Sequence, residues 1–228
     1  MAVKDIGKKN LAGKGRHSMN VNRTTKLFFI LIFCISAIAV PSMGLLAHAQ
    51  ETGGTIEGTV DSPWVTRYQA LVYIDQMKGD FPPPKQPAVM SQKNMVFAPH
   101  ILPVVKGTTV DFTNDDTVAH NVFTPPGAAV RFNLGLYGPG VKKTVTFNTL
   151  GEVPLLCNVH PDMLGFIIVL QNPYFDLTDP SGKFQIKNVP PGTYQLKVWD
   201  EKVEGAPQQV VVTAGKTTSV EFKGLKKR

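Results

Sequence analysis

The sequence contains very little cysteine, since only Cys34 and Cys157 occur among its 228 residues. Cys34 lies in an apolar N-terminal run, so one cysteine remains for the rest of the chain and an internal disulfide framework is excluded there. Helical periodicity is also nearly absent, which argues against a helical fold. There is no glycine-rich phosphate loop and no G-x-S-x-G sequence, so the usual signatures of nucleotide binding and of serine hydrolases are missing.

The chain also lacks a hydrophobic run long enough to cross a bilayer. Its most apolar stretch, from Leu27 to Val40, has 14 residues, whereas a spanning helix needs about 20. Basic residues precede this stretch, and Ala47-His48-Ala49 follows it as an A-x-A cleavage site. The arrangement predicts a secretory signal peptide over residues 1–49, cleaved after Ala49, and a periplasmic or otherwise exported protein with no membrane span in its mature form. The alternative is an uncleaved membrane anchor.

An excess of one charge is missing once the predicted leader is removed. The whole chain holds 24 Lys and Arg and 17 Asp and Glu, but 7 of the basic residues and 1 of the acidic residues lie in residues 1–49. The remainder therefore carries 17 basic and 16 acidic residues. Because there is no basic stripe, neither nucleic acid nor a membrane surface is expected as a partner.

What the sequence does contain is a series of short segments of alternating hydrophobicity, separated by Gly, Pro, Asn and Asp. This pattern is typical of an all-β sandwich or barrel. The proline-rich segment 81–87 is expected to be an extended connector. The predicted strands cover residues 54–60, 70–74, 94–97, 101–105, 108–114, 120–123, 143–147, 153–157, 165–170, 183–186, 192–199, 208–213 and 217–222.

Four residues form the strongest chemical signal. Cys157, His160 and Met163 are spaced C-x2-H-x2-M, and His120 lies 37 residues before Cys157, at the start of a predicted strand. One thiolate, two imidazoles and one thioether form the ligand set of a type 1 (blue) copper electron-transfer site. Soft sulfur suits Cu(I) and nitrogen suits Cu(II), so this set serves both oxidation states. We therefore predict one copper ion bound by these four residues.

Each of these residues has an ordinary alternative when it is taken alone. A single cysteine or methionine is often only a buried core residue, and zinc also binds Cys and His. The conjunction of all four, with Met163 at this spacing, favours copper. A cysteine hydrolase would have to use the same Cys157 and His160, and the further histidine pairs of multicopper enzymes are missing. We therefore predict no enzymatic activity, and we expect His100 to be structural or on the surface.

Residues from about Gln92 to Asn172 resemble a cupredoxin domain. The resemblance rests on the segment 106–114, on His120-Asn121-Val122 and on the loop 157–163, which has the length found in amicyanin. It implies a Greek-key sandwich or barrel in which Asn121 hydrogen-bonds across the site and steadies the ligand loops. Many cupredoxins place aromatic residues just before the ligand cysteine, where this chain has Leu155 and Leu156. Phe132 and Tyr137 are expected to fill that volume instead.

The segments 178–186 and 189–196 resemble a carboxypeptidase regulatory-like, transthyretin-type β-sandwich. That family usually opens with segments like 54–60 and 70–74, which here precede the cupredoxin-like stretch. The resemblance implies an insertion, in which residues 50–82 and 173–228 form one small sandwich and residues 83–172 form the cupredoxin domain within it. The whole arrangement also resembles small exported proteins associated with methylamine utilisation.

These features predict an exported carrier of single electrons between a redox donor and a redox acceptor, neither of which the sequence identifies. The exposed edge of His160 is the expected electron port, surrounded by Pro125, Pro126, Pro161 and Leu164. Two alternatives stay open. One is a delivery or sequestration protein that exchanges copper itself, and the other is a metal-free structural β-sandwich module.

Overall fold

The computed structural model describes residues 53–228. The predicted signal peptide, residues 1–49, lies outside these described residues. Within them every regular element is a β-strand, so the predicted all-β fold is confirmed. This part of the chain contains no helix that is both long and apolar enough to cross a membrane.

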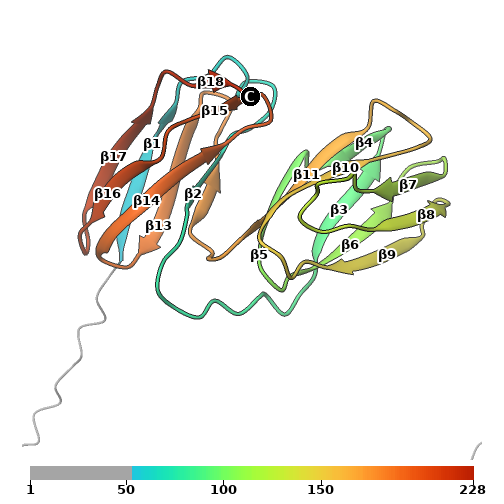
Figure 1. The fold of residues 1–228 in the computed structure, drawn as a ribbon, viewed down its shortest axis with the longest axis horizontal. Coiled ribbons are helices and arrows are strands. Elements are labelled where there is room, and N and C mark those ends of the chain that lie inside the picture. Colours follow the sequence, from blue (N-terminus) through green and yellow to red (C-terminus); the bar gives the residue numbers. More distant parts are fainter. Residues whose placement is uncertain (1–52) are drawn as a thin grey trace, which may run out of the picture. The chain divides into compact units, whose positions relative to one another are not determined.

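Strands β3 to β11 form one sandwich, here called the central sandwich (Figure 1). One sheet has the order β5-β11-β10-β7-β8 and the other β4-β3-β6-β9. The pairs β5–β11 and β3–β6 are parallel, whereas the remaining neighbours in these two sheets are antiparallel. The strands are β3 (Ala88–Lys93), β4 (Val96–Ala98), β5 (Ile101–Val105), β6 (Thr109–Asn114), β7 (His120–Phe123), β8 (Asn133–Tyr137), β9 (Lys142–Thr146), β10 (Gly151–Leu156) and β11 (Leu164–Leu170).

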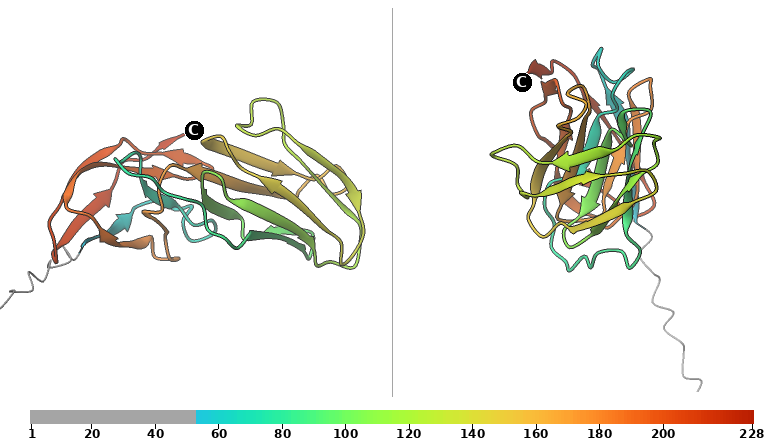
Figure 2. Two further views of the ribbon diagram at one scale, coloured as in Figure 1. Left: turned by 90° about the horizontal axis from the view of Figure 1, so that it is seen from below. Right: turned by 90° about the vertical axis from the view of Figure 1, so that its right-hand side faces the viewer.

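The remaining strands form a second sandwich, here called the split sandwich because its strands come from both sides of the central one in the sequence. Its sheets have the orders β13-β1-β17 and β12-β2-β14-β15-β18, with β16 also paired to β14. Figure 2 shows cyan β1 among the orange and red strands that come last in the chain. The strands are β1 (Gly54–Val60), β2 (Leu71–Ile74), β12 (Phe175–Leu177), β13 (Lys183–Val189), β14 (Gly192–Trp199), β15 (Val203–Glu204), β16 (Gln208–Val212), β17 (Thr217–Phe222) and β18 (Lys226–Lys227).

Strand β11 is apolar without alternation because both of its faces are covered. All its residues from Gly165 to Leu170 are buried. Ile167 and Val169 belong to the apolar cluster of the central sandwich, whereas Phe166, Ile168 and Leu170 on the opposite face belong to a cluster that also contains Trp199. Gly165 has no room for a side chain, since a Cβ there would lie 2.7 Å from the Cβ of Phe97. The close packing of β11 against β4 therefore fixes the strand that leads away from the predicted ligand loop.

The strand predicted over residues 94–97 is wrong in its first half. Asn94 and Met95 have φ angles of 54° and 59°, and they form a two-residue turn between β3 and β4, where Lys93 pairs with Val96. A tight hairpin requires this left-handed conformation at both central residues, and asparagine adopts it readily. Strands β3, β8, β12, β15 and β18 were not predicted. The last three have only two or three residues each, too few to show a periodic pattern.

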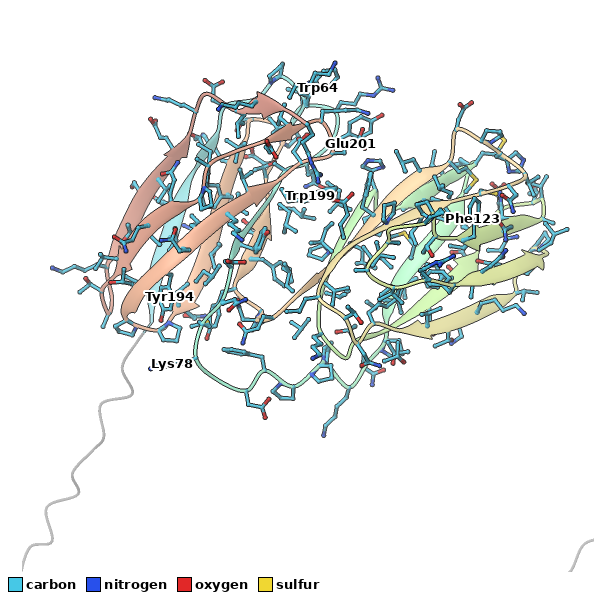
Figure 3. The ribbon with its side chains drawn as sticks, in the orientation of Figure 1. Trp64, Lys78, Phe123, Tyr194, Trp199 and Glu201 are labelled. Atoms are coloured by element: carbon cyan, nitrogen blue, oxygen red, sulfur yellow. The ribbon has the colours of Figure 1, made fainter. Side chains whose placement is uncertain are left out.

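The described residues contain three apolar clusters. One fills the split sandwich, one fills the central sandwich, and a third contains residues from both. In the third cluster, Trp199 from β14 packs against Phe166 from β11 with ring centroids 5.0 Å apart. Trp199 Nε1 also donates a hydrogen bond to Glu152 Oε2 at 2.9 Å. Trp199 and Glu201 are both labelled in Figure 3. Glu201 follows β14, and its Oε2 atom lies 2.7 Å from His100 Nε2.

Candidate metal centre

Three of the four predicted ligands lie on one short loop between two paired strands. Cys157 directly follows β10, and Met163 directly precedes β11. Leu156 and Leu164 are the last residues of the β10–β11 ladder, so they close the base of the loop. Within the loop, the Met163 amide donates to the His160 carbonyl oxygen at 3.0 Å. The strands and this turn together hold the loop in a compact form.

The fourth predicted ligand, His120, is the first residue of β7 and is fully buried. It follows a turn that the Asn114 side chain organises. Asn114 Oδ1 accepts from the Asp116 amide at 3.1 Å, and Asn114 Nδ2 donates to the Val118 carbonyl oxygen at 2.9 Å. Asparagine side chains commonly replace a backbone partner in such turns. The turn delivers the chain into β7 with the imidazole directed inward.

The structure brings the side chains of His120, Cys157 and His160 together. One ligand atom from each residue lies within 4.8 Å of the others, and no other such group occurs among residues 53–228. The Nδ1 atoms of the two imidazoles are 3.1 Å apart. Met163 is 1% exposed and belongs to the same core cluster as Cys157. His100 lies apart from this group, beside Glu201.

Asp116 determines which nitrogen of His120 is available to a metal. Asp116 Oδ2 lies 3.1 Å from His120 Nε2, and the backbone amides of Met95 and Thr117 hold the pKa of its carboxyl below the usual range. The ionised carboxylate can only accept, so the hydrogen-bond network assigns the proton of His120 to Nε2. The lone pair is thereby left on Nδ1, which faces His160. A carboxylate that orients a histidine in this way is common around metal sites.

Asn121 connects three segments around the site. Its Oδ1 accepts from the Asn158 amide at 3.3 Å, which ties β7 to the ligand loop. Its Nδ2 donates to Asn133 Oδ1 at 2.9 Å, which ties β7 to β8. Gln92 Nε2 of the opposite sheet lies 3.4 Å from the Asn121 carbonyl oxygen. The position of the loop relative to β7 therefore depends on one buried amide.

Two residues near the site were missed by the sequence reasoning. The role of Asp116 could have been suspected from an acidic side chain four residues before a histidine at the start of a strand. The role of Asn133 depends on β8, which was not predicted as a strand. Phe132 packs against Phe112 and Phe147 with centroids 5.6 and 6.0 Å away, and Tyr137 is buried in the same core. Tyr137 thus belongs to the apolar cluster that contains Cys157 and Met163, and the partly buried Phe132 packs against that cluster.

The donor atoms suit a copper ion. A buried thiol, a buried imidazole with a free Nδ1, a half-buried imidazole and a buried thioether converge on one region. Soft sulfur combined with imidazole nitrogen favours copper over magnesium or calcium, which prefer oxygen. Residues 86–170, which contain the whole group, match the protein family described as "Copper binding proteins, plastocyanin/azurin family". Residues 86–170 form a cupredoxin domain.

The cupredoxin domain therefore corresponds to the central sandwich. Residues 171–220 of the split sandwich match the family described as "Polysaccharide lyase family 4, domain II", an fn3-like β-sandwich. This match confirms the prediction of a second, small β-sandwich in addition to the cupredoxin domain. The matched family differs from the transthyretin-type family that the sequence resembles. No match was found among the curated proteins.

Several solved structures are similar to part of the chain. A structure described as a novel purple cupredoxin from Nitrosopumilus maritimus is 26% identical, with a TM-score of 0.33, and the match covers 36% of this chain and 98% of that one. Amicyanin from Paracoccus versutus is 23% identical, with a TM-score of 0.34, covering 43% and 96%. A copper-containing nitrite reductase from Thermus scotoductus is 22% identical, with a TM-score of 0.36, covering 49% and 28%.

Proposed function

We propose that the protein is an exported, mononuclear type 1 copper protein that carries single electrons between redox partners and has no enzymatic activity of its own. His120, Cys157, His160 and Met163 would hold the copper ion. The observation that carries this proposal is the convergence of one buried thiol and two imidazoles within 4.8 Å in a cupredoxin domain. Bound there, copper would supply a one-electron couple between Cu(I) and Cu(II).

The chain's own residues would limit the rearrangement that accompanies electron transfer. Cys157 and Met163 are pinned by the ends of β10 and β11. His120 is held by Asp116, and the loop is held by Asn121. A ligand set that is fixed before the metal binds cannot adapt fully to either oxidation state. Similar geometry in both states lowers the structural change that each transfer requires.

His160 is the ligand through which electrons would enter and leave. It is half-buried, whereas His120 is 0% exposed. Pro161 and Pro126 are exposed, Leu164 and Pro125 are partly exposed, and the neighbouring Val159 is 46% exposed. An apolar rim of this kind would allow a redox partner to approach closely. Replacing Leu164 with Glu should lower the rate of electron exchange with the partner, while the visible absorption of the copper site is retained. An unchanged rate would contradict the proposal that electrons pass through this apolar surface.

The deciding experiment is a titration of the metal-free protein with Cu(II), followed by visible spectroscopy. A strong thiolate-to-copper charge-transfer band, bleached reversibly by a reductant, is expected. The band should be absent in Cys157→Ser and unchanged in His100→Ala, because His100 lies outside the ligand group. A band that survives in Cys157→Ser would show that the thiolate is not a ligand, and tight binding of zinc alone would replace the redox role with a structural one.

The alternative of copper delivery predicts a different outcome. A delivery protein would hold Cu(I), release it quickly to a chelator and form no stable coloured Cu(II) complex. The two imidazoles lie with their Nδ1 atoms 3.1 Å apart and His120 is fully buried. Such a preformed and enclosed site favours retention of the ion, and therefore the electron-transfer role.

Two further elements of the proposal concern processing and domain boundaries. We propose cleavage after Ala49, which the N-terminal sequence of the exported protein would test.

We also propose that residues 83–172 are inserted into a sandwich made from residues 50–82 and 173–228. The test is a fragment of residues 83–172 in which Phe166 and Ile168, which belong to the cluster shared by both sandwiches, are replaced by polar residues. A fragment that folds and binds copper would support the insertion. A molten fragment would indicate one merged fold.

A further inference from the structure

Strand β8 contains a bulge beside the candidate metal centre. Strands β7 and β8 lie side by side (Figure 1), and Asn121 of β7 pairs with Leu136 of β8. The next pair joins Phe123 to Asn133, so a step of two residues on β7 corresponds to a step of three on β8. The extra residue is accommodated at Gly135, whose φ angle of 67° is the left-handed conformation that glycine adopts without strain.

The bulge determines the face of the sheet on which Asn133 lies. In a regular ladder the residue opposite Phe123 would be Leu134, and Asn133 would project from the other face. With the bulge, Asn133 is opposite Phe123 and therefore on the same face as Asn121, two residues earlier on β7. Bulges beside functional sites often redirect a side chain in this way.

A chain of three hydrogen bonds runs from this bulge to the ligand loop. The Gly135 amide donates to Asn133 Oδ1 at 2.9 Å, and Asn121 Nδ2 donates to the same oxygen at 2.9 Å. Asn121 Oδ1 accepts from the Asn158 amide at 3.3 Å. Because Asn158 directly follows Cys157, the chain ends on the loop that carries three of the four predicted ligands.

The two ends of this chain fix the orientation of both side-chain amides. Each end is a backbone N–H group, which can only donate. The atom of Asn133 that faces Gly135 must therefore be its oxygen. For the same reason the oxygen of Asn121 must face Asn158, which leaves the nitrogen of Asn121 to donate to Asn133. Asn121 is 4% exposed, so the opposite orientation would leave buried polar atoms unpaired.

We propose that Asn133 is a positioning residue for the copper site, because it fixes the amide of Asn121, which in turn holds the ligand loop. This inference rests on the proposed function, in which Cys157, His160 and Met163 bind copper. A loop that is already held in place loses less freedom when the metal binds, so the affinity for copper is higher. Asn133 acts on the metal only through Asn121.

The first test is amide hydrogen exchange in the metal-free protein, followed by NMR. In Asn133→Ala the Asn158 amide should exchange about threefold to tenfold faster, as expected when one hydrogen bond is lost. The amide of Ile167, in the middle of β11, should exchange at an unchanged rate, because a positioning role affects the loop and not the sheet. Asn133 is exposed, so the substitution leaves no cavity in the core.

Two further variants provide the rescue and the control. Asn133→Asp should keep the slow exchange of the Asn158 amide, because a carboxylate of the same shape accepts from both donors. Asn148→Ala removes an exposed asparagine from the loop between β9 and β10, and it should leave the exchange of the Asn158 amide unchanged.

Three exchange results would overturn the proposal. An unchanged rate at Asn158 in Asn133→Ala would show that the loop does not depend on Asn133. Equally fast exchange in Asn133→Asp and Asn133→Ala would show that the acceptor oxygen is not what matters. An equal acceleration at Ile167 would indicate a general loss of stability and not a positioning role.

Copper affinity separates this inference from the proposed function. In competition with a Cu(I) chelator, Asn133→Ala should bind copper about threefold to tenfold more weakly than the unmodified protein, whereas Asn148→Ala should bind it equally well. An unchanged affinity in Asn133→Ala would overturn the positioning role and leave the carrier function intact. If the unmodified protein binds no copper, the proposed function fails and the copper role of Asn133 fails with it.

Discussion

The cores of the two sandwiches differ in what they bury. The split sandwich is filled by aliphatic residues and by Phe184 and Phe222. The central sandwich buries Cys157, Met163 and Tyr137 among its apolar residues, and polar His120, Asn121 and Gln92 lie at the same end. A polar group in a core has to be hydrogen-bonded or it destabilises the fold. The comparison shows that the candidate metal ligands lie within a hydrogen-bonded network of polar side chains.

That network accounts for the arrangement of buried amides in the cupredoxin domain. Asn114 organises the turn before His120, and Asn121 joins β7 to the ligand loop. Apolar side chains could pack in these places but could not hold a loop in one position by directional bonds. The split sandwich contains no comparable group of metal-binding side chains among its described residues. Its buried polar side chains, such as Thr178 and Asp200, accept hydrogen bonds from nearby backbone amides instead.

The largest effects are expected from removing a buried phenylalanine ring from either core, and they distinguish residues that affect stability alone from residues that also affect copper binding. Phe112→Ala in the cupredoxin core and Phe222→Ala in the split-sandwich core should each lower the free energy of unfolding by about 3–5 kcal/mol, because both rings are almost fully buried. Only Phe112→Ala should also weaken copper binding. Denaturant unfolding and copper titration of both variants measure the two effects. Equal losses of copper affinity would show that the two sandwiches do not act separately.

The next effect concerns the carboxylate that orients His120. Asp116→Ala should lower copper affinity about 10–100-fold, because His120 Nε2 loses its acceptor and the imidazole can turn or change tautomer. Competition with a copper chelator measures the affinity. The matched control is Asp115→Ala, since Asp115 Oδ2 accepts from the hydroxyls of Ser91 and Thr113 and does not contact His120. If both variants bind copper equally well, Asp116 has no orienting role.

A smaller effect is expected where the two sandwiches share a cluster. Trp199→Phe removes the donor to Glu152 Oε2 and should lower the free energy of unfolding by about 1 kcal/mol, a modest value because Glu152 is partly exposed and keeps its contact with Arg228. Trp64→Phe is the control, because Trp64 is 41% exposed. Denaturant unfolding of the metal-free variants gives both values. The prediction fails when the Trp64 variant loses as much stability as the Trp199 variant.

The smallest effect is a pH dependence in the cupredoxin domain, away from the ligands. Hydrogen bonds from Lys142 and Thr144 hold the pKa of Asp111 below its usual range. A carboxyl with a depressed folded-state pKa stabilises the fold above its unfolded pKa, near 3.9, and this stability is lost as pH falls through the lower folded value. Asp111→Asn should therefore unfold at a lower temperature than the unmodified protein at pH 7.

The difference between Asp111→Asn and the unmodified protein should begin to shrink below about pH 4, where the carboxyl becomes protonated in the unfolded chain, and should vanish below the lower folded-state pKa, where it is protonated in both states. Asp80→Asn, an exposed position, is the control and should show no such convergence. Melting temperatures measured between pH 3 and pH 7 provide the comparison. A difference that persists unchanged at pH 3 would mean that the charge of Asp111 is not what stabilises this edge.

The sequence by itself determined the all-β class and the presence of a cupredoxin domain beside a second sandwich. Periodicity and turn residues located strands such as β1 and β17, because each is bounded by clear turn signals and alternates between two faces. The C-x2-H-x2-M spacing identified candidate ligands, since a short loop forces residues three apart to remain close. These features are local and are therefore visible in a single sequence.

Only the tertiary structure decided what lies around those ligands. The pairing of β7 with β8 brings Tyr137 and Asn133 beside His120 and Asn121 from more than ten residues away. In the left-handed turn formed by Asn94 and Met95, the backbone amide of Met95 donates a hydrogen bond to Asp116 Oδ2, although the two residues are 21 positions apart in the sequence. Such contacts depend on strand register and on how distant segments pack, and a register shift of one residue reverses every side chain. Register of this kind is set by the whole fold, which no short motif encodes.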